Sequence, residues 1–483
     1  MLLRSLTAAL LLTFPGQPAW AEGLIAQAEA APSAAEESPA DALSIDDGPG
    51  DSGEEIGNTE QPPLDDTDRL IVDGLTQYEN RDLDGAKATL EQALAAAETS
   101  NNPDQLSFAL TMLGLVTVNQ GDYAAAADYG QRAIAALEEV DDPQSTVVSL
   151  NVLGLTAQAQ GNLPDAIGYS QQALQLAESI EFNSGALNSL SILATSYRAI
   201  GQSPLALEAA QLLIPLAQEE RNAPALLSAL DVASSSLLNL GEYETALVAA
   251  QDALTVATEL DRASERALAL SNMGVAHYRL ANLDQAIEAQ TEALALSEEN
   301  GPVDVQFTAL YVLALAHYDQ GDLETAVDFY ERRLVLSRET NAVGAELQSL
   351  LGLSSAYLDS GNYGDAIASF DDLLALSQER NQPLFQSLSL SGLGFANVQL
   401  ENYPVAQGHL EEALTIAKDM GDREAEFGLL SLLAEVHQAQ DNTQQAEDYA
   451  AEAAALQAEA EAASEETDAG TEETETGAEA EGE

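Results

Sequence analysis

The sequence predicts an all-α protein, a right-handed superhelical solenoid of about ten antiparallel helix pairs. A leucine recurs every forty residues from Leu70 to Leu430, and a column of Gly, Ala or Ser keeps the same step from Gly74 to Ala434. An alanine also recurs at this step, at Ala86, Ala126, Ala166, Ala206, Ala246, Ala286, Ala326, Ala366, Ala406 and Ala446. Because no insertion interrupts the period, each unit is expected to pack only against its neighbours.

Each forty-residue unit is predicted to hold two helices, helix A followed by helix B. In residues 104–143, Leu106, Leu110 and Leu113 have the spacing of one helical face. Gly121 follows as the turn residue, since glycine ends a helix in the left-handed conformation at little cost. Helix B then runs from about Tyr123 to Glu139, and Ala126 is placed where it crosses helix A.

The net charge limits the partners that the chain can bind. The 483 residues include 81 acidic and 16 basic side chains, which gives a net charge of −65. Such a surface repels phosphate backbones, so we expect no nucleic-acid partner, and it favours basic partners. An acidic surface also serves solubility in salty surroundings, and the sequence leaves these two explanations open. The absence of cysteine excludes disulfides and thiolate metal sites.

Four segments are expected along the chain. Residues 1–21 have the pattern of a signal peptide, with Arg4, an apolar run and Ala19-Trp20-Ala21 as the cleavage motif. Residues 22–63 and 464–483 are acidic, contain no basic residue, and are expected to be disordered linker and tail. Residues 64–463 hold the ten repeats. We expect an exported protein of the bacterial periplasm or exterior, with no membrane span.

The repeated residues resemble the tetratricopeptide repeat, whose signature is W-x2-L-G-x2-Y…A-x3-F…P. In the second unit Leu110 stands for the Trp, Leu113-Gly114 match the Leu-Gly pair, and Ala126 matches the Ala. The Tyr position is kept by Tyr197 and Tyr357. The forty-residue length is similar to the longer repeats of the LGN/Pins group and of arrays beside bacterial CHAT domains.

The resemblance implies that helix A lines a concave groove and that its exposed side chains bind peptides. Carried over by register, three rows of side chains would face this groove. Their members are Asn151 and Tyr311 in the first row, Arg198, Tyr278 and Tyr318 in the second, and Asn119, Asn239 and Arg279 in the third. Amide, phenol and guanidinium groups suit hydrogen bonding to a peptide backbone or carboxylate.

No catalytic residue, metal site or cofactor is expected. His277, His317 and His437 occupy one column of helix A. Successive units are roughly 10 Å apart, whereas metal–nitrogen bonds are about 2 Å long, so one zinc ion cannot be shared. No nucleophile motif accompanies them.

The sequence therefore predicts an exported, non-enzymatic scaffold that binds a protein or peptide in its concave groove. The alternative is an accessory subunit of a bacterial envelope or polysaccharide assembly complex. The sequence leaves the partner and the oligomeric state open.

Overall fold

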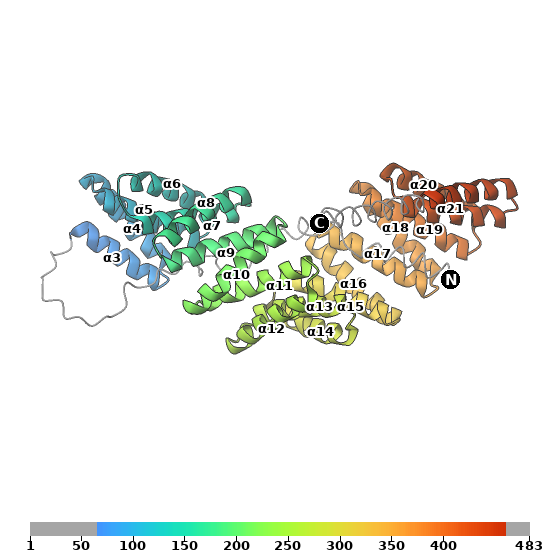
Figure 1. The fold of residues 1–483 in the computed structure, drawn as a ribbon, viewed down its shortest axis with the longest axis horizontal. Helices are drawn as coiled ribbons and strands as arrows, with labels where there is room; N and C mark the ends of the chain where they lie inside the picture. Colours follow the sequence, from blue (N-terminus) through green and yellow to red (C-terminus); the bar gives the residue numbers. More distant parts are fainter. Residues whose placement is uncertain (1–64, 460–483) are drawn as a thin grey trace, which may run out of the picture. The chain divides into compact units, whose positions relative to one another are not determined.

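The computed structural model describes residues 65–459, and every regular element within this range is a helix. The predicted all-α solenoid of antiparallel helix pairs is confirmed (Figure 1). The expected signal peptide at 1–21, the linker at 22–63 and the tail at 464–483 lie outside the described residues.

The helix boundaries repeat the forty-residue period of the sequence. The A helices are α3 (Asp66–Glu79), α5 (Pro103–Asn119), α7 (Pro143–Ala159), α9 (Asn183–Ala199), α11 (Ala223–Asn239), α13 (Ala263–Arg279), α15 (Val303–Asp319), α17 (Val343–Asp359), α19 (Pro383–Gln399) and α21 (Arg423–Ala439). The B helices are α4 (Leu83–Ser100), α6 (Tyr123–Leu137), α8 (Leu163–Ser179), α10 (Ser203–Glu219), α12 (Tyr243–Glu259), α14 (Leu283–Asn300), α16 (Leu323–Thr340), α18 (Tyr363–Glu379) and α20 (Tyr403–Met420), followed by helical residues 443–459.

A left-handed residue makes the turn between helix A and helix B. Gly121 has φ +74° and no atom within 4 Å of the position of a Cβ, so the backbone conformation alone favours glycine there. Arg81 and Ala281 keep a positive φ at the same position of their units. The packing of the two helices therefore sets the conformation of the turn. Glycine only lowers the free-energy cost of the positive φ.

The alanine column lies at the centre of each helix pair. From Ala86 to Ala406 these side chains are at most 1% exposed, and Ala446 in the last pair is 6% exposed. Helix B packs on the A helices before and after it in most repeats, as α10 does on α9 and α11. A methyl group at each crossing lets three helices approach closely, which explains why the column never varies.

A second pair of columns is matched in size from one repeat to the next. Tyr330 and Phe370 on the B helices are almost fully buried, and the next helix A offers Gly352 and Gly392 opposite them. A Cβ on Gly352 would lie 2.3 Å from the Tyr330 ring. Where helix B carries glycine, large side chains of helix A take the space: a Cβ on Gly130 would lie 2.9 Å from Leu153 and 3.7 Å from Val152. The space between the two columns is thus filled either by a large residue of helix B that faces glycine or by large residues of helix A that face glycine.

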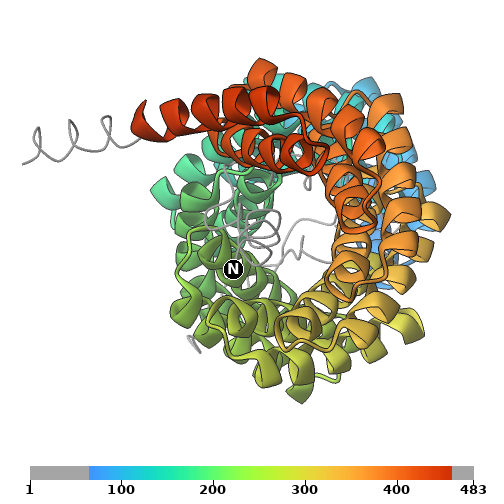
Figure 2. The same ribbon diagram turned by 90° about the vertical axis from the view of Figure 1, so that its right-hand side faces the viewer.

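The described residues form two compact units, 65–309 and 310–459. In the turned view of Figure 2, the helices of each unit lie in two layers. A helices contact the next A helix in both units, as α7 contacts α9 and α17 contacts α19. None of the described helices has the length and apolar character needed to cross a membrane.

The matched columns predict a compensating double substitution. Gly352→Val should cost about 1–3 kcal/mol through overpacking, and Tyr330→Ala about 3–5 kcal/mol through a cavity. The double variant should be more stable than Tyr330→Ala alone, because valine then fills the space left by the ring. Chemical denaturation combined with hydrogen exchange over residues 323–359 measures these differences. Gly364→Val is the matched control, since no atom lies within 4 Å of its Cβ position; strict additivity of the two substitutions would contradict the packing argument.

Candidate functional site

The inner face is the side of the A helices that turns away from the B helices. On α9 it carries Ser191, Thr195 and Arg198, which are not buried although the rest of this helix is largely covered. The Ser191 and Thr195 hydroxyls donate to carbonyls one turn earlier in their own helix, at 2.8 Å each. The hydroxyls of these short side chains form their hydrogen bonds within their own helix. The longer charged side chains are then the groups on this face that could contact a ligand.

Polar side chains connect neighbouring A helices across the inner face. The Asn119 amide donates to the Tyr78 hydroxyl at 3.0 Å, and Gln158 donates to Thr195 Oγ1 at 2.8 Å. The Thr111 and Ser149 hydroxyls lie 2.8 Å apart in the same way. The inner face is therefore partly occupied by bonds within the protein.

The structure corrects one of the predicted groove residues. Asn151 is 1% exposed; its amide donates to the Gly185 carbonyl at 3.0 Å, and its side-chain oxygen accepts from Ser189 at 2.8 Å. It joins α7 to α9 and cannot reach a ligand. The register placed it correctly along the helix, but the approach of the next A helix covers it.

The other predicted residues are accessible to different degrees. In the 65–309 unit, Asn119 and Tyr278 are half-buried, whereas Arg198, Asn239 and Arg279 are exposed. The Asn239 amide donates to Ser203 Oγ at 3.3 Å, which ties it to the start of α10. Of these residues, only Arg198 belongs to a larger polar cluster.

Two predicted tyrosines belong to the 310–459 unit. The Arg333 guanidinium lies over the Tyr311 ring, 4.7 Å from its centroid. The Tyr318 hydroxyl donates to the Asp359 carboxylate, which sits on the next A helix. Burial and this bond raise the pKa of Tyr318, so the hydroxyl keeps its proton and acts as a donor. Both tyrosines serve first as links between helices.

An inner cluster groups side chains of four successive A helices: hydrogen bonds join those of α9, α11 and α13, and a charge effect links α9 to α15. It consists of Arg198 on α9, Asp231 on α11, Asn272 on α13 and Asp304 at the start of α15. Arg198 Nη1 lies 2.8 Å from Asp231 Oδ2, and the Asn272 amide donates to Asp231 Oδ1 at 3.0 Å and to Ser234 at 2.8 Å. The cluster carries one positive and two negative charges.

Asp304 is linked to Arg198 through its charge. Asp304 is exposed at the first turn of α15. Partial desolvation raises its pKa, and the guanidinium of Arg198 lowers this pKa in part. The two groups therefore influence one another although they lie on different A helices.

Sequence reasoning missed Asn272 and Asp304. Asn272 occupies a column that holds Met112, Val152 and Ile192 in earlier units, so a polar residue in an apolar column was the available signal. Asp304 had no such signal, because an acidic residue in the first turn of a helix is ordinary.

The histidines do not form a joint site. Residues 65–459 contain no group of three side chains that could hold a metal ion. His317 and His437 stack on Phe329 and Tyr449 of the following B helices, at 5.6 and 5.3 Å between ring centroids. These contacts make the histidines packing residues.

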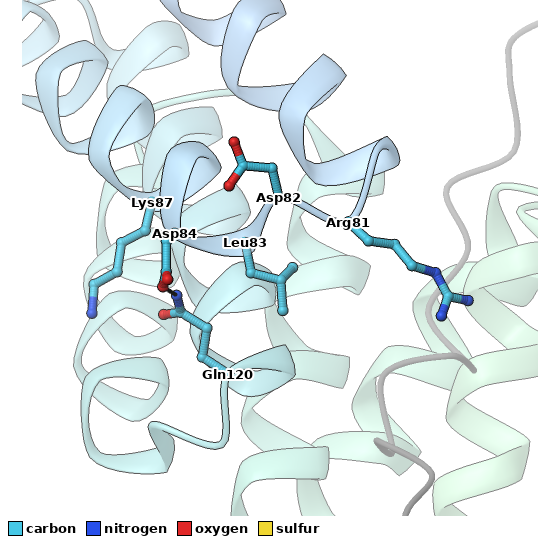
Figure 3. A pocket seen from close by; sticks show the side chains of 6 residues that line it. All are labelled: Arg81, Asp82, Leu83, Asp84, Lys87 and Gln120. Carbon is cyan, nitrogen blue, oxygen red and sulfur yellow. Dashed lines mark hydrogen bonds between the residues drawn. The ribbon is translucent and has the colours of Figure 1, made fainter.

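A shallow pocket at the first turn holds Arg81, Asp82, Leu83, Asp84, Lys87 and Gln120 (Figure 3). Asp82 caps α4 through the Gly85 amide at 3.0 Å, and Gln120 donates to Asp84 at 2.8 Å. Lys87 lies 3.7 Å from Asp122, while Figure 3 shows Arg81 directed away from both acids. The polar groups of this pocket hold the first two repeats together, so we do not assign it a ligand.

The inner cluster predicts a shift that titration can measure. Arg198→Met should raise the pKa of Asp304 further, because the positive charge that favours its ionised form is lost. A raised pKa in the folded state means that stability falls as the pH rises from the ordinary value of 3.8 through the raised pKa. Carboxyl NMR titration of Asp304 checks the shift, with Arg279→Met as the matched control. An unchanged pKa in Arg198→Met would show that the two side chains do not interact.

Comparisons with known proteins agree with the repeat architecture. Four family models, each described as tetratricopeptide repeat, match residues 73–140, 145–219, 267–300, 309–342 and 349–384, which together exceed half of the chain. No curated protein matches in sequence.

Two solved structures share the fold. The apo form of RapI is 13% identical with a TM-score of 0.50, over 70% of this chain and 99% of that chain. A signal transduction ATPase with a tetratricopeptide repeat sensor, PH0952 from Pyrococcus horikoshii, is 16% identical with a TM-score of 0.51, over 71% of this chain and 55% of that chain. From the repeat columns, the helix pairs and the family models together, the chain belongs to the tetratricopeptide repeat family.

Proposed function

We propose that the chain is an exported, non-enzymatic scaffold that binds a protein or peptide on its inner face. The inner cluster carries the proposal, because four helices contribute one group each to a single charged patch. Arg198 is 42% exposed and Asp231 19% exposed, so a ligand can reach both groups.

The charge of the cluster favours a ligand with a basic group. Two carboxylates face one guanidinium, and Asp231 already accepts bonds from both Arg198 and Asn272. Asp304 is therefore the acid available to a lysine, an arginine or an amino terminus. Asp304 is exposed, so a cationic partner can reach it.

The small hydroxyl side chains beside the cluster leave room for an extended segment. Ser235 on α11 and Thr308 on α15 donate to backbone carbonyls in their own helices, as Ser191 and Thr195 do on α9. A peptide backbone could then lie against the helices, while the Arg198 guanidinium offers donors to its carbonyls.

A peptide selection on the whole chain tests this function. Displayed random peptides should enrich for a lysine or arginine, and Asp304→Asn should weaken the selected peptides about ten- to a hundredfold, the effect of one charged hydrogen bond. The matched control is Glu288→Gln, an exposed acid on helix B. Equal affinity for wild type, Asp304→Asn and Asp231→Asn would refute binding at the inner face.

Export is proposed from the signal pattern of residues 1–21 and has a separate test. Expressed in a bacterium with its full leader, the chain should accumulate outside the cytoplasm with Glu22 as its first residue. Replacing Ala19 and Ala21 with larger residues should block this processing. A protein that keeps Met1 and stays in the cytoplasm would contradict export.

A further inference from the structure

A second surface lies on the opposite side of the 65–309 unit, between two B helices. The structure has a groove of about 460 Å³ between α10 and α12, with α11 as its floor. These three helices are neighbours in the array (Figure 1). The groove is mainly apolar, and its lining includes Leu207, Ile214, Leu226, Leu237, Val248 and Val256.

The groove lies where one column loses its bulk. Ala233 lines the floor. The same position holds Asp73 in the first unit and Leu113, Leu153, Leu193, Met273, Leu313, Leu353, Leu393 and Leu433 in the others. Ala249 lines the wall of the groove. Its column is aromatic at Tyr129, Tyr169 and Phe329 but small at Ala209, Ala289 and Ser369. The groove thus coincides with the leucine that is missing at Ala233 and with a small residue in its wall.

The rim departs from its column in the opposite sense. Val248 is 62% exposed, whereas this position is acidic in five other units, at Asp128, Glu208, Glu288, Asp328 and Asp448, and is Ala or Gly in the remaining four. Covering such an exposed apolar side chain with a partner is favourable in free energy, because its apolar surface is removed from water. Loss of bulk in the floor and gain of apolar surface at the rim therefore occur in the same place.

The surrounding charge identifies the kind of partner. Residues 203–259 contain Glu208, Glu219, Glu220, Asp231, Glu242, Glu244, Asp252 and Glu259, with Arg221 as their single basic residue. Asp252 itself lines the groove. The chain's own segments 22–63 and 464–483 are acidic and would be repelled.

We propose that the groove between α10 and α12 docks a basic amphipathic helix of another protein. Large apolar side chains of that helix would occupy the space left by Ala233 and Ala249. Its lysines or arginines would face Asp252 and the acidic residues around the groove. An apolar anchor in a pocket with a charged rim is the arrangement that makes a helix-in-groove contact specific.

The probe is a synthetic helix of about 18 residues, or five turns, built from Leu, Trp and Lys with the apolar residues on one face. Its binding to the full chain is followed by fluorescence anisotropy of a label on the peptide. Ala233→Leu with Ala249→Tyr restores the residues that other repeats carry and should weaken binding about tenfold or more. The melting temperature of this variant should not fall, because it fills a groove.

Further variants keep the test decisive if the filled protein folds poorly. Val248→Glu restores the usual charge of its column and should also weaken binding, whereas Val335→Glu, at a 56% exposed valine outside the groove, should not. A peptide with Glu in place of Lys should bind about tenfold more weakly or worse. Asp304→Asn should leave the probe bound, which separates this surface from the inner face.

Three results would overturn the proposal. One is a wild-type chain that does not bind the basic probe, and another is equal binding by the filled variant. The third is self-association of the chain, seen by sedimentation without peptide and abolished by filling the groove, since the occupant would then be a second copy.

Discussion

The close crossing of helices at the alanine column is the constraint on which the rest of the structure depends. A helix B such as α10 packs against the A helices on both sides of it, and the buried methyl of the column, as at Ala206, sets how closely they approach. A larger side chain would separate the helices along the whole pair, so the column cannot vary. Because this contact repeats without insertion, every other column keeps its register and is free to change.

Two kinds of variation follow from that freedom. In one, neighbouring repeats exchange volume, as Tyr330 with Gly352 and Gly130 with Val152 show, and the interior stays filled. In the other, volume is lost without replacement, as at Ala233 and Ala249, and the surface opens into a groove. The two cases differ in whether the facing residue on the neighbouring helix is larger where the first residue is smaller. A repeat protein can in this way place a binding surface at one point of its length while the neighbouring repeats remain ordinary.

Electrostatics acts on a different scale from packing. The net charge of −65 makes basic partners favourable over the whole surface, and salt screens this attraction. The inner cluster adds a local effect, because the pKa of the exposed Asp304 reflects both desolvation and the charge of Arg198. In the proposed function, the broad field attracts a basic partner and the acids of the cluster hold its charge.

The sequence by itself determined the helix pairs, their forty-residue period and the family, because these depend on spacing along one chain. It also placed Arg198 on the face that carries the inner cluster. It could not show that Asn151 is covered, since that depends on how closely α9 approaches α7. Only the tertiary structure linked Asp304 to the charge of Arg198, because the two residues lie on different helices far apart in the chain. It likewise decided that two alanines open a groove, which depends on the side chains that face them from other helices.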